Sequence, residues 1–235
     1  MMRRTEVSQM RRRIGLRRIA AAFIALFPLN CVRCFMYRSI GYKISGSRIG
    51  WGTIIAIDQL TMTDALIGRY NKISGPLKLS MMSKSSIGSH NTLVCDFWTM
   101  DEMHVKFKYR RHMVCFERAT VTNHHWFDVT DRISIGAYSY VAGIGTQFWT
   151  HGFSDEDRDI SIGADCYIGA GCILTPGSAI ADRCIVGAGS VVSKKFTAQF
   201  CLLAGNPTAV VRDGYYWRSR SVFDPDNPPP LPYRS

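Results

Sequence analysis

Residues 162–197 read IGADCYIGAGCILTPGSAIADRCIVGAGSVVSKKFT, and an aliphatic side chain recurs in this stretch at every sixth position. A small side chain follows four residues after each of the first five aliphatic residues. The aliphatic column is Ile162, Ile168, Leu174, Ile180, Val186 and Val192, and the small column is Cys166, Cys172, Ser178, Cys184 and Ser190. A period of six matches neither the 3.6-residue period of a helix nor the alternation of a strand. It fits a chain that turns a corner every six residues, so that three short faces close one triangular coil.

A coil of this kind buries its aliphatic residues only when another coil stacks on it, so the pattern predicts a solenoid. Four glycines supply the backbone freedom that the corners need: Gly163, Gly169, Gly177 and Gly187. The rhythm is fainter over residues 44–98, where the residues in step are Ile49, Ile55, Thr61, Ile67, Ile73 and Leu79, then Ile87 and Leu93 after a slip of two. We therefore predict earlier coils there. Between residues 99 and 121 the rhythm blurs, and we expect a coil with unusual corners.

After the repeat comes LAGNPTAVVR at residues 203–212. Together with residues 162–197, this segment resembles the left-handed parallel β-helix acyltransferases built on hexapeptide repeats, and among them the galactoside, maltose and polysaccharide O-acetyltransferase branch. The resemblance covers residues 120–212 well and residues 44–98 loosely. It implies an all-β, left-handed parallel β-helix over residues 41–212. The left-handed sense comes from the resemblance alone, because parallel crossovers are otherwise right-handed. The resemblance also implies a homotrimer, with the cleft between neighbouring subunits.

The formal net charge of +11 raises the question of nucleic-acid binding. Seven arginines and one glutamate in residues 1–18 give +6, which leaves +5 for the rest of the chain. The excess is thus concentrated in a terminal arm, and no helix-turn-helix, zinc-finger or aromatic-basic signature accompanies it. We expect no nucleic-acid partner.

Residues 1–40 form a basic arm followed by the apolar run IAAAFIALFPL. Eleven residues interrupted by Pro28 are too few to cross a bilayer as a helix. An amphipathic arm could lie on the inner face of the cytoplasmic membrane, with its arginines at anionic head groups and Ile19, Phe23, Leu26 and Phe27 in the interface. The alternative is a helix that caps the open end of the solenoid. Residues 213–235 are a Pro-rich, aromatic tail, which we expect to run along the surface or a neighbouring subunit.

The eight cysteines do not suggest disulfides, because three of them occupy the small column of the repeat. Small core-filling thiols indicate a reducing, cytoplasmic compartment. Cys31 and Cys34 form a single C-x-x-C unit with no second pair at zinc-like spacing, so we expect no metal.

His151 is the candidate catalytic residue. About nine residues beyond the six-residue rhythm, 152–160, must leave the coil as a loop, and His151 stands at its root in WTHG. In the enzymes that this sequence resembles, the base is a histidine in such a context. Imidazole suits the task because a sugar hydroxyl needs a general base near neutral pH. One of Asp155, Glu156, Asp157 and Asp159 could orient its ring.

The resemblance implies further roles around this histidine. Asn123 falls where the galactoside branch carries an asparagine that helps to place the acceptor, and Asp128 falls near acceptor-contacting aspartates. His124 and His125 lie beside them and could line the same cleft, or they could be a second candidate for the base. For acetyl-CoA, the implied path follows the outside of the C-terminal coils. The residues on it are Tyr167, Ala170, Ala188, Ser193, Lys194 and Arg212. Lys194 and Arg212 suit the phosphates of the cofactor.

These residues predict an acetyl-CoA-dependent O-acetyltransferase that acts on a sugar hydroxyl, of a cell-surface polysaccharide or its lipid-linked precursor. An alternative is an N-acyltransferase that acts on a nucleotide-linked amino sugar. A zinc-dependent carbonic anhydrase of the same fold would need H-x-x-x-x-H, which is absent from the sequence. A non-catalytic scaffold is opposed by His151 and by the intact GAGS and GNP segments.

Overall fold

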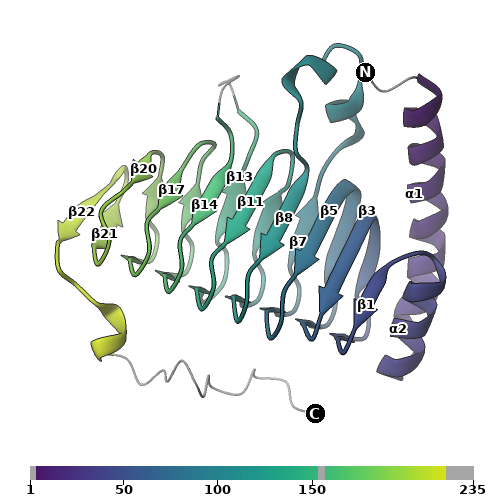
Figure 1. Ribbon diagram of the computed structural model, residues 1–235, viewed down its shortest axis with the longest axis horizontal. Helices are drawn as coiled ribbons and strands as arrows, with labels where there is room; N and C mark the ends of the chain where they lie inside the picture. Colours follow the sequence, from purple (N-terminus) through teal and green to yellow (C-terminus); the bar gives the residue numbers. More distant parts are fainter. Residues whose placement is uncertain (1–3, 153–156, 221–235) are drawn as a thin grey trace.

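The computed structural model describes residues 4–152 and 157–220, and in it the chain forms a stack of triangular coils closed at one end by two helices (Figure 1). The prediction of a parallel solenoid is confirmed: the strand pairs between successive coils are parallel, and only the final pair, β21 with β22, is antiparallel.

The first face of the prism is a nine-stranded sheet. Its strands are β2 (Arg48–Ile49), β4 (Leu66–Ile67), β6 (Ser86–Ile87), β9 (Thr120–Val121), β12 (Tyr140–Val141), β15 (Tyr167–Ile168), β18 (Ile185–Val186), β21 (Leu202–Gly205) and β22 (Thr208–Arg212).

The other two faces join in a thirteen-stranded sheet, because β3 (Ile54–Thr63) and β5 (Lys72–Met81) run through the corner between them. The second face continues with β7 (Thr92–Val94), β10 (Trp126–Asp128), β13 (Gln147–Trp149), β16 (Ile173–Leu174) and β19 (Val191–Val192). The third face contains β1 (Lys43–Ser45), β8 (His112–Cys115), β11 (Arg132–Ile135), β14 (Ile160–Ile162), β17 (Ala179–Ile180) and β20 (Lys195–Phe196).

Both columns of the repeat lie inside the prism, as predicted. The six aliphatic residues from Ile162 to Val192 are at most 2% exposed, and so are the five small residues from Cys166 to Ser190. The cysteines fill corners: the thiols of Cys166 and Cys184 lie against backbone carbonyls of the next coil. Burial raises the pKa of the Cys166 thiol to about 12, so these side chains behave as small neutral fillers.

The earlier coils follow the predicted rhythm with one exception. Thr61 is exposed, and its neighbours Leu60 and Met62 are buried instead. The pairing of β3 with β5 shifts between Ile57 and Gln59, where the strand rounds the corner. Because strand side chains alternate between the two sides, a shift of one residue exchanges inside and outside.

The corner glycines act mainly through close packing. A Cβ added at Gly169 would lie 2.6 Å from the backbone nitrogen of Ala188 in the next coil, and only Gly177 of the four predicted corner glycines has a left-handed φ, at +78°. The absence of a side chain therefore lets the coils stack at the spacing of a sheet.

Two segments leave the prism on the same long edge, between the second and third faces (Figure 1). The prediction that residues 99–121 form a coil with unusual corners is wrong for its first part. Residues 96–111 form a loop with two short 3-10 helices, η1 (Phe97–Met100) and η2 (Val105–Phe107), and the coil resumes at β8. The second segment follows β13, and residues 153–156 of the predicted loop lie outside the described residues. The coil resumes at Ile160, which was assigned to the loop but is buried at the start of β14.

The segments before and after the coils pack against the solenoid at different places. Helices α1 (Arg4–Ala25) and α2 (Asn30–Ser39) lie over the first coil. At the other end, the chain after β22 turns back to the short helix η3 (Trp217–Arg220), where the Trp217 indole donates to the backbone oxygen of Asp165. The tail therefore runs along its own chain as far as residue 220, and the rest of the predicted tail lies outside the described residues.

Candidate active site

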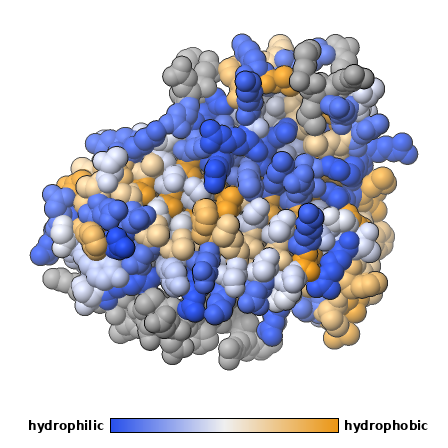
Figure 2. Space-filling view, in the orientation of Figure 1, coloured by the Kyte–Doolittle hydropathy of each residue, from blue (hydrophilic) through white to orange (hydrophobic). Residues whose placement is uncertain are grey.

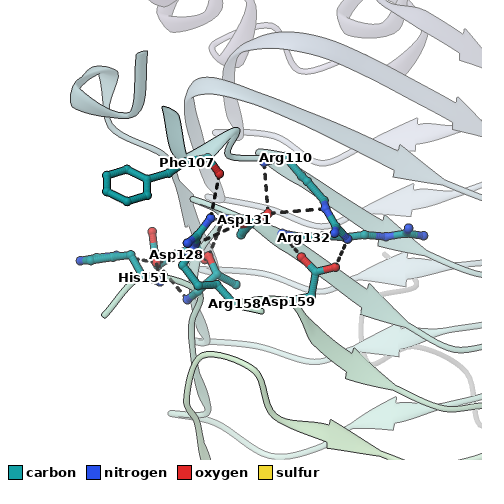
Figure 3. Close-up of polar contacts among 9 residues, drawn as sticks. Phe107, Arg110, Asp128, Asp131, Arg132, His151, Arg158 and Asp159 are labelled. Carbon is teal, nitrogen blue, oxygen red and sulfur yellow. Dashed lines mark hydrogen bonds and ion pairs between the residues drawn. The ribbon is translucent and has the colours of Figure 1, made fainter. Parts of the chain in front are cut away.

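His151 and Asp128 meet at the edge from which both loops leave. His151 follows β13 and Asp128 ends the neighbouring strand β10. The Nδ1 atom of His151 lies 2.6 Å from Oδ2 of Asp128. The His151 side chain is 45% exposed and the Asp128 side chain only 6% exposed. A buried carboxylate thus holds one nitrogen of a ring that faces the solvent (Figure 3).

The Asp128 carboxylate is fixed by its surroundings. Oδ1 accepts a hydrogen bond from the Thr130 hydroxyl at 2.7 Å. Oδ2 accepts from the backbone nitrogens of Thr150 at 3.0 Å and His151 at 3.1 Å. Donors from two successive coils satisfy the carboxylate, which allows a buried charge to persist.

This carboxylate determines the state of the His151 ring. The hydrogen bond from Nδ1 to Asp128 raises the pKa of His151 above its ordinary value, and partial burial opposes that shift. With its proton on Nδ1, the neutral ring presents the lone pair of Nε2, which bonds to no described residue. The pair therefore has the arrangement of an oriented general base. Two of the four loop carboxylates that could orient the ring have other partners: Asp157 pairs with Lys195, and Asp159 pairs with Arg110. The other two, Asp155 and Glu156, lie outside the described residues.

Two tryptophans flank His151. The Trp98 ring, from η1, lies edge-on with its centroid 5.7 Å from that of the imidazole. The Trp149 ring, on β13, lies at 6.2 Å, and Trp126 of the neighbouring strand lies 6.1 Å beyond Trp149. No role was predicted for these tryptophans from the sequence. Trp149 could have been noticed within WTHG, but nothing in the sequence placed Trp98 beside His151.

The two loops are joined next to the site by Arg158, which also forms a buried ion pair with Asp131, and by Arg110. The Arg158 guanidinium donates to Oδ2 of Asp131, with Nε at 3.1 Å and Nη2 at 3.0 Å, and Nη2 also donates to the carbonyl of Phe107 at 3.0 Å. Arg110 from the first loop pairs with Asp159 from the second. These contacts join residues 107–110 to residues 158–159 across the corner after β10 (Figure 3).

His125 lies at the other end of β10 and is 2% exposed. Its Nδ1 accepts the Thr146 backbone N–H at 3.1 Å, and its Nε2 lies 2.9 Å from the Thr122 hydroxyl. Burial lowers the pKa of His125 to about 4. Both ring nitrogens are engaged in the corner, which suits a structural role better than that of a base.

Asn123 and four of the implied acetyl-CoA residues lie on two different edges of the prism. Asn123 accepts the Ser89 backbone N–H at 2.7 Å in the corner between the first and second faces. Ala170 and Ala188 lie in later corners of that same edge. Ser193 and Lys194 are exposed between β19 and β20, on the edge of His151. Within one chain, His151 and Asn123 are therefore separated by the width of the second face.

The remaining two residues lie on the first face. Tyr167 stacks on Tyr140 with ring centroids 5.9 Å apart, and the Trp217 ring also contacts it, with centroids 5.3 Å apart. Arg212 ends β22, and its guanidinium lies 5.7 Å from the Tyr215 ring. Part of the implied path, at Tyr167, is thus occupied by the tail of the same chain.

Residues 159–194 match the family model described as bacterial transferase hexapeptide (six repeats). The match covers the regular coils from β14 to β19, and over the described residues the solenoid has the fold of a left-handed parallel β-helix.

Solved structures with a similar course of the backbone include three acetyltransferases. The polySia-specific acetyltransferase NeuO is 16% identical, with 75% of this chain and 83% of that chain covered and a TM-score of 0.49. The maltose O-acetyltransferase from Clostridium difficile 630 is 20% identical, with coverages of 89% and 86% and a TM-score of 0.43. The acetyltransferase VCA0836 from Vibrio cholerae, solved in complex with acetyl coenzyme A, is 17% identical, with coverages of 89% and 90% and a TM-score of 0.42. At these identities the likeness is one of fold alone.

Proposed function

We propose that this chain is an acetyl-CoA-dependent O-acetyltransferase that acts on a sugar hydroxyl, with His151 as its general base. The observation that carries the proposal is the contact of 2.6 Å between Nδ1 of an exposed histidine and a buried carboxylate. Acyl transfer from a thioester to a hydroxyl needs a group that removes the hydroxyl proton as the new bond forms, and an oriented neutral imidazole does this.

The reaction would proceed by direct transfer. Nε2 of His151 takes the proton of the acceptor hydroxyl as its oxygen attacks the thioester carbonyl carbon. The carbon–sulfur bond of the tetrahedral intermediate then breaks, and the proton on Nε2 passes to the departing thiolate. Asp128 stabilises the imidazolium between these two steps, so we assign it the positioning of His151 rather than contact with the acceptor.

The tryptophans beside His151 support a carbohydrate as acceptor. The rings of Trp98 and Trp149 both lie within about 6 Å of the imidazole and present apolar surface beside it. The C–H face of a sugar ring packs well on such a surface while its hydroxyls stay in hydrogen bonds. We propose that the acceptor is a polysaccharide or a precursor of one.

The separation of the two edges supports a site shared between subunits. Asn123, Ala170 and Ala188 lie on one edge, and His151, Ser193 and Lys194 lie on another. In a homotrimer, the first edge of one chain would face the second edge of its neighbour, so that acetyl-CoA and the acceptor meet between them. All eight cysteines are free, which supports a cytoplasmic location, where thiols stay reduced.

The test is an assay of thiol release from acetyl-CoA with a panel of mono-, oligo- and nucleotide sugars, for the wild type and His151→Ala. His124→Ala is measured beside it, because this exposed histidine on the other edge is another candidate for the base. Thiol release that depends on the acceptor and is lost only in His151→Ala supports the proposal. An amine is a better nucleophile than a hydroxyl, so turnover of amino sugars that survives in His151→Ala would favour the alternative N-acyltransferase. A protein that binds no acetyl-CoA would overturn both.

A further inference from the structure

The helices that close the first coil carry apolar side chains on both their inner and their outer face. On the inner face of α1, Ile14, Ala21 and Ile24 are buried over the coil. Arg17 is buried with them, and its guanidinium donates to the carbonyls of Ile57 and Asp58 at 2.7 Å. The expectation that a helix caps the solenoid is therefore confirmed, and Arg17 belongs to the cap rather than to a lipid-binding surface.

The outer face of the cap is also apolar. Its large side chains are between 41% and 68% exposed: Leu16, Ile19, Phe23, Leu26 and Phe27 of α1 and the residues just after it, Leu29 in the connection, and Phe35 in α2. From Leu16 to Leu26 these apolar side chains recur every three or four residues, and Phe27 follows directly after Leu26. This spacing places them in one stripe along the helix. Figure 2 shows hydrophobic residues along this outer edge, with hydrophilic residues towards the start of α1.

A helix that is apolar on both faces needs an apolar environment on both. The solenoid provides one of them. At the same time, no helix in residues 4–152 and 157–220 has the length and apolar character needed to cross a bilayer. The stripe is therefore suited to lie in the interface between water and lipid rather than to span a bilayer.

The charges around the stripe indicate what covers it. Arg11 pairs with Asp101 of the first loop, and Arg13 pairs with Asp58 of the solenoid. Arg12, one turn before Leu16, and Arg18 are exposed and pair with no carboxylate among the described residues. The only acidic residue in positions 4–39 is Glu6, in the first turn of α1. A second copy of this cap would bring like charges together, whereas an anionic lipid surface offers both acyl chains and phosphates.

We propose that the outer face of α1 and α2 binds the surface of an anionic phospholipid membrane. The stripe from Leu16 to Phe27, with Leu29 and Phe35, enters the interface, and Arg12 and Arg18 contact the phosphates. The sequence suggested a contact through the whole of residues 1–40. The structure restricts it to one face and removes Arg11, Arg13 and Arg17 from it. This inference does not depend on the proposed enzymatic function.

The experiment is flotation of the full-length protein with vesicles of phosphatidylcholine and phosphatidylglycerol, compared with phosphatidylcholine alone. We expect the protein to float with the mixed vesicles and to be released by salt, because exposed charges are screened. Phe23→Ser with Leu26→Ser should lower the partition coefficient at least about tenfold, since both side chains lose their burial in the interface. Arg12→Gln with Arg18→Gln should lower the partition coefficient about fivefold for each arginine. This effect should be seen only with the vesicles that contain phosphatidylglycerol.

Two matched controls keep the test specific. Ile144→Ser with Val211→Ser removes apolar side chains of similar exposure, 60% and 61%, elsewhere on the chain. Lys72→Gln with Arg183→Gln removes two exposed charges that lie outside α1 and α2. Both should float like the wild type. Circular dichroism of each variant confirms that the cap is folded. Wild type that does not float, cap variants that float normally, or a concentration-dependent dimer abolished by the cap variants would each overturn the proposal. Thiol-release activity is measured separately, so the two proposals can fail independently.

Discussion

The imidazole of His151 and the carboxylate of Asp128 are joined by a contact of 2.6 Å, although 23 residues separate them in the chain. The carboxylate is buried and receives four further hydrogen bonds from Thr130, Thr150 and the His151 backbone. The ring itself is exposed at the edge where two loops meet. Such an arrangement orients a base without hiding it from a substrate.

Replacing His151 by alanine should reduce kcat at least about 100-fold, because the step loses its general base. The thermal midpoint should stay within about 2 °C of the wild type, since the side chain is exposed and follows a strand. Steady-state thiol release and calorimetry on the same preparation measure both quantities. A variant that unfolds, or one that keeps most of its kcat, would contradict the assignment.

The activity should depend on the protonation of His151. A base acts in its neutral form, so kcat/KM should rise with pH through a pKa above 6.5, because Asp128 stabilises the imidazolium. In Asp128→Asn this stabilisation is lost, and the inflection should move to lower pH while kcat falls. The measurement is the pH profile of kcat/KM for both proteins. An inflection that stays in place in Asp128→Asn would show that another group is being titrated.

Trp98 should contribute to binding of the acceptor and not to binding of acetyl-CoA. In Trp98→Ala we expect the acceptor KM to rise by about tenfold, from the loss of ring contact worth about 1–1.5 kcal/mol. The KM for acetyl-CoA should be unchanged. Trp51→Ala, an exposed tryptophan on the first coil, is the control. Equal changes for both substrates would indicate a disturbed loop instead.

Arg158 should be required for stability. Its side chain and that of Asp131 are 7% and 6% exposed, so Arg158→Ala leaves a buried carboxylate without its main partner. We expect a loss of about 3–5 kcal/mol in the free energy of unfolding. Arg183→Gln, at an exposed position, should change it by less than about 0.5 kcal/mol. Urea denaturation measures both, and equal effects would argue against the role of the pair.

His125 should make the fold sensitive to acid. Its pKa is lowered to about 4 by burial, whereas in the unfolded chain it is near 6.5, so between these values the unfolded chain binds the extra proton. The free energy of unfolding should therefore fall as pH drops from 6.5 to about 4, by about 3 kcal/mol at most. In His125→Gln this part of the pH dependence should disappear. An unchanged dependence in that variant would assign it to other groups.

Much of the fold could be predicted because each coil is determined locally. A six-residue period specifies which residues point inward, and every inward aliphatic residue from Ile162 to Val192 is buried. His151 could be selected because it stands at the point where the rhythm breaks. The first loop could not be located in the same way. Residues 96–111 contain aromatic residues and lysines in no fixed period, so nothing marked the point where the chain leaves the coil.

The neighbours of His151 depend on the number of residues in each coil and on the loop that carries Trp98. In the regular coils, Leu174 pairs with Val192, which is 18 residues further on, whereas Asp128 pairs with Trp149 across 21 residues. An uninterrupted period would place Ile133 beneath His151 and would leave Asp128 unconnected to it. Trp98 comes from still further away, on a loop that folds back over the edge.

The sequence by itself determined the six-residue coil, the composition of its core and the position of the exposed histidine, because these follow from local turning and the burial of alternate side chains. The tertiary structure alone decided which carboxylate orients that histidine, which tryptophans flank it, and which face of the terminal helices stays uncovered. These relationships depend on how many residues each coil and each loop contains, and on which side of a helix faces the first coil. A six-residue period specifies neither.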